Sequence, residues 1–194
     1  SFEVISIGKG KNNPFDRYAK PSDLVSEAMQ KRMNPKMLTS FVDGTKTMVE
    51  MTALANSIGF SVDKEGMHGP KSQPKDLNKI FIPKEDGGIL SNKGIVDFAF
   101  GIAPGVFTVI YSEDEYVNYE MEYLKMGEGP YWSLYRPYHL TSLETPRTIM
   151  DLAINKEPIL NANFWNVYVA AYAKRNLKVG DKLDSIGGEC YFGV

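Results

Sequence analysis

Short apolar runs, each closed by glycine, proline or asparagine, recur along this 194-residue chain and predict β-strands. The first run is rich in β-branched residues and leads into alternating glycine and lysine from Gly8, where we expect the strand to end and a loop to begin. The predicted strands cover residues 2–7, 95–100, 106–111, 131–135 and 167–173, with a short extended segment at residues 37–42.

Apolar residues spaced three and four positions apart predict helices between these strands. The clearest helix covers residues 44–58, with Asp43 as its N-cap and Gly59 as its stop. Its core-facing stripe consists of Met48, Met51, Ala55 and Ile58. The other predicted helices cover residues 22–33, 113–125 and 143–154, and a short helical stretch is expected within residues 74–81.

Strands interspersed with helices indicate an α+β fold, in which a mixed sheet packs against helices. The character of the sequence changes from Phe164 onward, where a short apolar run is followed by a basic turn. We therefore predict a main domain of residues 1–157 and a small β appendage of residues 158–194. Because the first residues already have the pattern of a strand, we expect the chain to be part of a longer protein.

The composition argues against several classes of partner. Apolar residues make up 43 %, charged residues 24 %, and the net charge is −2, so we expect no basic surface for nucleic acid or an anionic membrane. No apolar run approaches the roughly 20 residues that a membrane span needs. Cys190 is the single cysteine, which excludes an internal disulfide and a zinc cage. These features predict a cytoplasmic protein without a bound metal.

The loop expected after the first strand carries the groups best suited to an anionic ligand, Lys9, Lys11, Asn12 and Asn13. Ligands bind at the C-terminal ends of strands in α/β architectures, and two cations with two amides suit a phosphate or a carboxylate. A solvated basic turn is the alternative, and the residue types alone leave it open.

A second cluster of charges stands at the start of the helix over residues 44–58. Lys46 and Glu50 are four positions apart and share one face, one turn after Asp43. Three ionisable groups in one place could relay a proton or hold a reacting hydroxyl. The alternative is a capped helix with an exposed ion pair, which contributes only a few tenths of a kcal/mol.

His68, Arg136 and His139 complete the candidate residues. His68 lies in an irregular region rich in glycine and proline, where it could polarise a carbonyl or simply sit in a surface loop. Arg136 and His139 follow an aromatic strand and could bind a phosphate or have a structural role. No glycine-rich turn opens a helix after a strand, so any nicotinamide cofactor is expected to bind outside this chain.

Several long runs of this sequence resemble the homoserine dehydrogenase-like oxidoreductases that carry a C-terminal SAF-type domain. The matching runs are residues 8–14, 34–37, 40–51, 67–70, 83–88, 103–107 and 135–144. Some members are known as deoxyxylulose phosphate reductoisomerase-like enzymes, which use NADPH to make methylerythritol phosphate for isoprenoid synthesis. The resemblance implies a homodimer with an N-terminal Rossmann domain that holds NADP or NAD. This chain alone would then bind no cofactor and be inactive.

The resemblance also implies roles for individual residues. Lys9 falls at the position of a catalytic lysine, with Asp43, Lys46 and Glu50 as its catalytic companions. Lys46 and Glu50 exchange the charges of the pair in homoserine dehydrogenases, which argues against homoserine as the substrate. The phosphate of a small hydroxy or keto substrate would be held by Lys11, Asn12, Asn13, Arg136 and His139, with His68 as a further candidate.

The tail is similar to the SAF fold, a small β-clip, in which residues 173–180 form a structural turn. The strand near Trp132 is a candidate dimer seam. Two other readings stay open at this point: a non-catalytic sugar-phosphate or carbohydrate-binding module, and a purely structural dimerisation domain.

Overall fold

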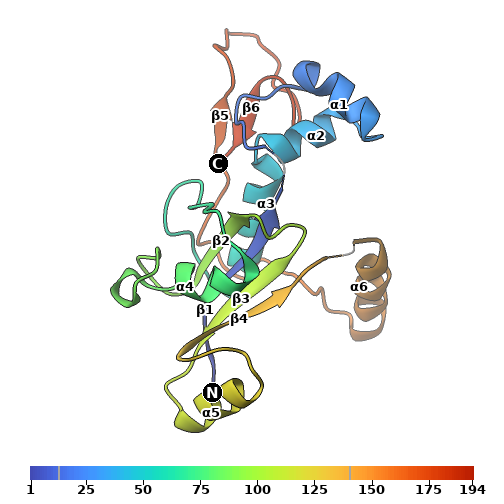
Figure 1. Cartoon of the computed structure of the whole chain (residues 1–194). Coiled ribbons are helices and arrows are strands. Elements are labelled where there is room, and N and C mark those ends of the chain that lie inside the picture. Colours follow the sequence, from blue (N-terminus) through green and yellow to red (C-terminus); the bar gives the residue numbers. More distant parts are fainter. Residues whose placement is uncertain (13, 140) are drawn as a thin grey trace. The chain divides into compact units, whose positions relative to one another are not determined.

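The chain forms two compact units, each built from segments that are distant in the sequence. Unit 1 comprises residues 1–12 and 54–166, and unit 2 comprises residues 13–53 and 167–194. The computed structural model describes residues 1–12, 14–139 and 141–194 (Figure 1). The predicted domain boundary near residue 157 stays a prediction.

Unit 1 is built on a mixed sheet with strand order β2-β1-β3-β4. Strand β1 is parallel to β2 and antiparallel to β3, and β3 is antiparallel to β4. The strands are β1 (Glu3–Lys11), β2 (Ile95–Phe100), β3 (Val106–Tyr111) and β4 (Tyr131–Arg136). The prediction of an α+β fold with a mixed sheet is confirmed, and β2 and β3 have the predicted bounds.

One face of this sheet packs against the short helices η2 (Pro74–Asp76) and α4 (Leu77–Ile80). The rings of Phe81 and Phe107 lie at the centre of this core, with centroids 4.7 Å apart. Other members of the core are Ile5, Leu77, Leu90, Ile95, Ala99, Ile102 and Val109. Burial of such side chains contributes about 1.5–3 kcal/mol each.

Strand β1 is longer than predicted because its glycines serve the packing of the sheet. A Cβ at Gly8 would lie 2.4 Å from the Phe107 ring, and a Cβ at Gly10 would lie 2.4 Å from the Ala103 backbone. Residues without a side chain therefore let the core approach the strand directly. The expected loop from Gly8 is wrong, since the strand continues to Lys11.

A second hydrophobic cluster lies at the end of the sheet where β1 begins. Helix α5 (Glu115–Tyr123) begins at Asp114, whose carboxylate accepts hydrogen bonds from the backbone of the first turn. Its Met121 packs on Ile110 of β3 and on Trp132 of β4, which is completely buried. Trp132 itself therefore belongs to the core, and the role of its strand as a dimer seam stays a prediction.

The rest of unit 1 consists of a short 3-10 helix, η3 (Lys84–Asp86), and of α6 (Thr141–Asn155). Helix α6 agrees with the predicted helix over residues 143–154 and has no buried residue. Helix α3 (Thr45–Ile58) begins in unit 2 and ends in unit 1. Of its predicted stripe, Met48, Met51 and Ala55 are buried, whereas Ile58 is exposed.

Unit 2 contains η1 (Pro21–Leu24), α1 (Val25–Gln30), α2 (Pro35–Val42), the first part of α3 and the antiparallel pair β5 (Ala171–Ala173) and β6 (Tyr191–Gly193). The expected extended segment at residues 37–42 is wrong, because α2 occupies it. The Asn34 side chain accepts a hydrogen bond from the Lys36 backbone at 2.9 Å, and Pro35 takes the first helical position. The predicted strand over residues 167–173 is reduced to β5.

Candidate active site

Two lysines stand at the C-terminal end of β1. Side chains alternate across a strand, so Lys9 and Lys11 point to the sheet face opposite to the one that Gly8 and Gly10 present to the core. Lys9 is level with Phe98 of β2, and Lys11 with Phe100. Lys9 is half-buried and Lys11 is only 5 % exposed. The two lysines predicted to lie in a loop are thus strand residues, Lys9 half-buried and Lys11 buried.

The ends of β1 and β2 meet at one edge of the sheet because the two strands are parallel. This edge is where ligands bind in sheets of this kind. Asn12 follows β1 and is exposed, and Asn13 lies outside the described residues.

A cavity of about 660 Å³ opens at the C-terminal end of β2. Phe100 and Gly101 form one wall, and Lys71 and Lys79 bring two cations to it. The volume is within the range of small-molecule sites, roughly 300–1,000 Å³. Asp76 also lines the cavity, so its charged groups are two cations and one carboxylate, and its size suits a small molecule.

The segment over residues 61–71 covers the free edge of β2. Backbone hydrogen bonds join it to the strand at both ends, from Val96 N to Ser61 O and from Phe100 N to Pro70 O. Between these points the Asp97 carboxylate accepts the backbone N–H groups of His68, Gly69 and Phe98 at 2.7–3.1 Å. Asp97 thus satisfies the backbone groups that a paired strand would have satisfied.

The His68 ring lies between two buried carboxylates. Its Nδ1 is 2.8 Å from Asp97 Oδ2, and its Nε2 is 3.2 Å from Asp63 Oδ2. The side chains of Asp63 and Asp97 are 2 % and 1 % exposed. Because both ring nitrogens are engaged, the geometry gives His68 an anchoring role. Its assignment as a substrate-binding residue stays a prediction.

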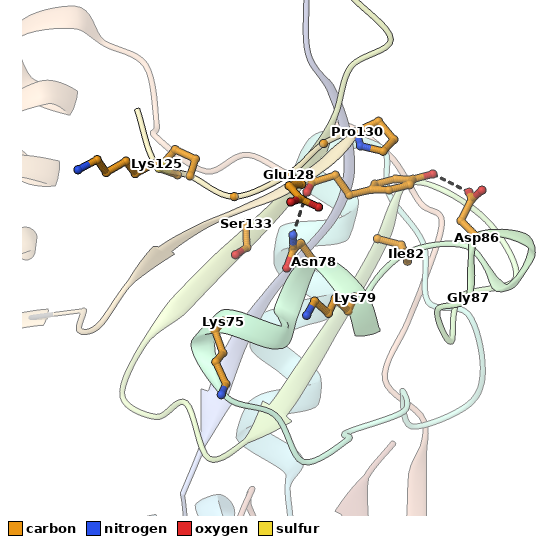
Figure 2. Close-up of a pocket in the computed structure, with 14 residues that line it drawn as sticks. Lys75, Asn78, Lys79, Ile82, Asp86, Gly87, Lys125, Glu128, Pro130 and Ser133 are labelled. Atoms are coloured by element: carbon orange, nitrogen blue, oxygen red, sulfur yellow. Dashed lines mark hydrogen bonds between the residues drawn. The ribbon is translucent and has the colours of Figure 1, made fainter. Parts of the chain in front are cut away.

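A second cavity, of about 710 Å³, lies between α4, the turn after α5 and the start of β4 (Figure 2). Tyr131 forms part of its wall, and its hydroxyl donates a hydrogen bond to Asp86 at 2.6 Å. Burial, together with this bond to a carboxylate, raises the pKa of Tyr131 well above its usual range. Tyr131 therefore stays protonated and acts as a fixed donor.

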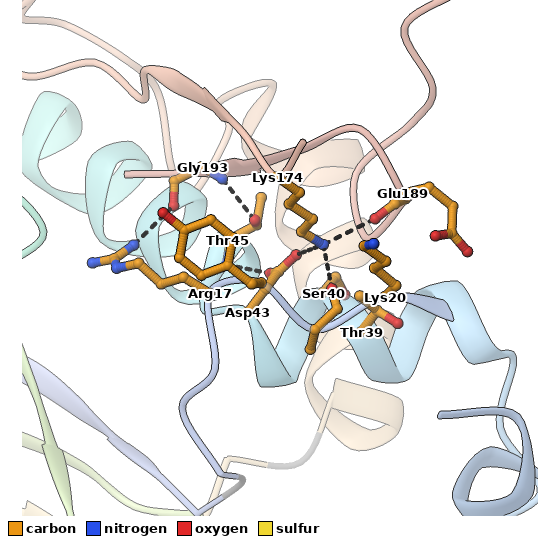
Figure 3. A network of polar contacts seen from close by, with 12 residues as sticks. Arg17, Lys20, Thr39, Ser40, Asp43, Thr45, Lys174, Glu189 and Gly193 are labelled. Atoms are coloured by element: carbon orange, nitrogen blue, oxygen red, sulfur yellow. Dashed lines mark hydrogen bonds and ion pairs between the residues drawn. The ribbon is translucent and has the colours of Figure 1, made fainter. Parts of the chain in front are cut away.

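Asp43, predicted to be catalytic, is an internal structural residue of unit 2. Its Oδ2 lies 2.9 Å from Lys174 Nζ, and its Oδ1 accepts a hydrogen bond from Thr45 N at 2.9 Å (Figure 3). Lys174 Nζ also donates to Ala19 O at 2.6 Å and to Gly188 O at 2.9 Å. All three ammonium protons have acceptors, and both side chains of the ion pair are fully buried.

The same unit holds the tail in place with further polar contacts. The Gly193 backbone donates to Thr45 Oγ1 at 2.8 Å, which attaches β6 to the start of α3. The Asp184 carboxylate accepts backbone N–H groups from Glu189 at 2.5 Å and from Cys190 at 3.2 Å. Burial would raise the pKa of Asp184, but these hydrogen bonds outweigh it and lower the pKa below its ordinary value.

Lys46 and Glu50 lie on an accessible face of α3. Their charged atoms are 3.8 Å apart, their side chains are 40 % and 34 % exposed, and Lys46 Nζ lies 4.4 Å from the centre of the Phe41 ring. This is the geometry of an exposed ion pair with a cation–π contact. Both groups can still reach a ligand from this face.

Arg136 ends β4 and forms an ion pair with Glu144 in the first turn of α6. Its guanidinium also lies 5.2 Å from the centre of the Tyr138 ring. His139 is exposed in the connection that follows. Within unit 1 the structure therefore ties Arg136 to the strand–helix junction.

Three important residues were not singled out by sequence reasoning, namely Asp63, Asp97 and Lys174. Asp97 interrupts an apolar strand, and a charge in such a run is the one available signal. Nothing local marks Asp63 or Lys174. In the described parts of the chain, no group of three or more histidine, cysteine, aspartate or glutamate side chains is placed to hold a metal ion. No helix formed by these residues has the length and apolar character to cross a membrane.

Comparison with known proteins adds one finding. The family model described as "Oxidoreductase DRL, catalytic domain" matches residues 1–145. The matched part includes the whole four-stranded sheet and ends inside α6. No curated protein sequence matches the chain at a significant level.

Proposed function

Since this chain belongs to the family of oxidoreductase DRL catalytic domains, we propose that it forms the substrate-binding and acid–base part of an NAD(P)H-dependent oxidoreductase. The proposed substrate is a small phosphorylated hydroxy or keto compound, with deoxyxylulose phosphate as the first candidate and isoprenoid precursor synthesis as the pathway. The observation that carries the proposal is the family match over a sheet whose central strand ends in Lys9 and Lys11. We expect the complete protein to be a cytoplasmic homodimer.

The described residues do not fit a dinucleotide. Such a cofactor is held by a glycine-rich turn that joins a strand to the start of a helix. Here Gly8 and Gly10 lie inside β1 and face the core rather than forming a turn. Strand β2 runs through its glycine turn into another strand, β3, and residues 112–114 between β3 and α5 contain no glycine. We therefore assign the nicotinamide nucleotide to another part of the complete protein and derive no step through it.

The role we propose for Lys9 is to hold and move a proton. An ammonium group at the edge of the sheet can donate a hydrogen bond to a substrate carbonyl oxygen and supply the proton that the resulting alkoxide needs. Low exposure strengthens this interaction because little water competes for the oxygen. Lys46 and Glu50 remain candidates for proton transfer, whereas the buried pair with Lys174 leaves Asp43 without a free carboxylate oxygen for this task.

Lys11 and Asn12 are the proposed phosphate ligands from the end of β1, with Arg136 and His139 as further candidates. The cavity beside the end of β2 supports binding of an anion in this region, because two lysines, Lys71 and Lys79, line it against one carboxylate, Asp76. Asn13 is proposed as a further phosphate ligand on the basis of the sequence alone.

The test is NADPH oxidation by the full-length protein, with deoxyxylulose phosphate as substrate and aspartate semialdehyde as the comparison. We expect turnover of the phosphorylated substrate only. Lys9→Met should lower kcat by about 10²–10⁴-fold, the usual contribution of a general acid or base, without changing the urea midpoint. Lys64→Met, at an exposed lysine of unit 1, is the matched control and should behave like the wild type.

Near-normal turnover by Lys9→Met would remove Lys9 from the mechanism. If neither substrate is turned over, the proposed substrate class is overturned, and the assignment to the oxidoreductase family is unaffected. Binding of deoxyxylulose phosphate without NADPH oxidation would favour the non-catalytic sugar-phosphate module instead.

A further inference from the structure

The cavity between α4, the turn after α5 and the start of β4 has no part in the proposed chemistry. Its volume of about 710 Å³ is within the range of small-molecule sites. Lys9, Lys11 and Asn12 are not among the described residues that line it. It shares Lys79 with the cavity at the end of β2, so the two cavities are neighbours.

Three lysines bring positive charge to this cavity. Lys75 and Lys79 come from the side of η2 and α4, and Lys125 comes from the turn that faces them (Figure 2). None of the three forms an ion pair with a described residue. Two carboxylates, of Asp86 and Glu128, also line the cavity, so its ammonium groups exceed its acidic groups by three to two. Ammonium groups without a partner are available to an anionic ligand.

The turn over residues 127–129 adds backbone donors to the same cavity. The N–H groups of Lys125 and Met126 still close the end of α5, but those of the next three residues donate to no described residue. Gly127 has a φ of +99°, and a Cβ built there would meet nothing within 4 Å. A ligand can therefore approach this backbone closely. Successive free N–H groups in a turn bind phosphates and other anions.

The remaining polar groups suit the hydroxyl groups of a ligand. Asn78 Nδ2 donates to Tyr131 O at 2.9 Å, which leaves Asn78 Oδ1 as an acceptor. The Ser133 hydroxyl has no hydrogen-bond partner among the described residues. Figure 2 shows the polar ends of Asn78, Lys79 and Ser133 turned toward the same space. Tyr131 is only 9 % exposed and holds Asp86 in the wall through its hydrogen bond of 2.6 Å.

We propose that this cavity binds a small phosphorylated hydroxy compound. The phosphate lies against the N–H groups of residues 127–129 and the three lysines, and the hydroxyl groups bind Asn78 and Ser133. A phosphate has three acceptor oxygens and up to two negative charges, so it uses the donors of both walls more fully than a carboxylate with two oxygens. The inference goes beyond the proposed function and does not rest on it, because the proposed proton-transfer residues lie elsewhere.

The test is a titration of the ¹⁵N-labelled 194-residue chain with glycerol 3-phosphate, followed by amide chemical shifts. We expect saturable shifts of the amide signals of residues 127–129. The Trp132 indole signal should shift with them, because its N–H donates to Gly127 O at 3.3 Å. Sodium chloride at equal ionic strength and glycerol alone should not reproduce these shifts.

Two lysine variants show whether the cavity itself binds the phosphate. Lys125→Met should raise the Kd about fivefold, the effect of one exposed charge contact, without changing the urea midpoint. Lys64→Met removes an exposed lysine of unit 1 that does not line the cavity, and its Kd should equal that of the wild type.

Three results would overturn the inference. One is the absence of saturable shifts in the millimolar range, and another is an equal Kd in Lys125→Met and the wild type. The third is a set of shifts at Lys71 and Gly101 in place of residues 127–129, which would put the phosphate in the neighbouring cavity. None of these results bears on turnover of deoxyxylulose phosphate, so failure of this inference and failure of the proposed function are distinguishable.

Discussion

The buried ion pair of unit 2 leads to a quantitative prediction for Lys174→Met. Lys174 Nζ makes three hydrogen bonds of 2.6–2.9 Å, and the side chains of Lys174 and Asp43 are both fully buried. Methionine fills a similar volume but leaves the Asp43 carboxylate buried and without its counter-charge. Removal of one partner from a buried pair destabilises proteins by about 3–5 kcal/mol, and we expect a loss in this range.

The assay is urea unfolding together with hydrogen exchange at the Lys174 amide, which donates to Cys190 O, and at the Asp43 amide, which donates to Thr39 O. Exchange at these positions reports the opening of unit 2 itself. Lys178→Met removes an exposed lysine from the same tail and should change the free energy of unfolding by less than about 0.5 kcal/mol.

A double-mutant cycle separates the ion pair from simple loss of packing. Asp43→Asn keeps an oxygen for the Thr45 amide, so combining it with Lys174→Met leaves no buried charge. We expect the double variant to be more stable than Lys174→Met alone. If Lys174→Met stays within about 1 kcal/mol of the wild type, the reasoning about this buried pair is refuted.

Three further outcomes follow from the described contacts. His68→Gln should destabilise unit 1 by about 1–3 kcal/mol and speed hydrogen exchange of the Gly69 amide, and unchanged exchange would contradict the anchoring role. Gly10→Ala should cost about 1–3 kcal/mol in urea unfolding because its Cβ meets the Ala103 backbone, whereas a loss below about 0.5 kcal/mol would mean that this turn gives way. Asp184 has a folded-state pKa below its ordinary value of 3.8, so its stabilisation is complete above that value and is lost as the pH falls through the lower one. Asp184→Asn should therefore flatten the acid dependence of unfolding, measured between pH 2 and 5, and an unchanged slope would refute this assignment.

Helices and strands with a clear apolar pattern and a clear boundary residue could be predicted from the sequence. Strands β2 and β3 are apolar runs separated by a glycine turn, and α3 has an apolar stripe and a first residue, Thr45, whose backbone N–H donates to the Asp43 carboxylate. Helix α2 was missed because Asn34 followed by Pro35 ends one helix and begins the next, and both readings are consistent with the local sequence. The C-terminal end of β1 could not be predicted, because it depends on the close approach of Gly10 to the Ala103 backbone, which no local sequence pattern reveals.

The residue types of the candidate site could be chosen from the sequence, and their roles stay predictions, whereas their pairings could not be foreseen. Lys9, Lys11 and Lys46 could be chosen because charged groups near strand ends and helix starts are suited to chemistry. The partner of Asp43, in contrast, lies 131 residues further along the chain in a basic turn that looks solvated. The Asp97 carboxylate that holds His68 is 29 residues away. Such contacts are set by tertiary packing, so sequence spacing cannot supply them.

The interleaved order of the two units has a consequence for synthesis on the ribosome. At elongation rates of roughly 5–20 residues per second, Asp43 is made about 7–26 s before Lys174, because 131 residues separate them. During this interval the segment over residues 13–53 has neither its ammonium partner nor strands β5 and β6. The sheet of unit 1, whose strands are all complete by Arg136, can form while the ribosome is still translating. Nascent chains halted between these points would hold the Asp43 carboxylate without its counter-charge and the Tyr18 ring without Phe192, so residues 13–53 complete their packing only after the tail has been made.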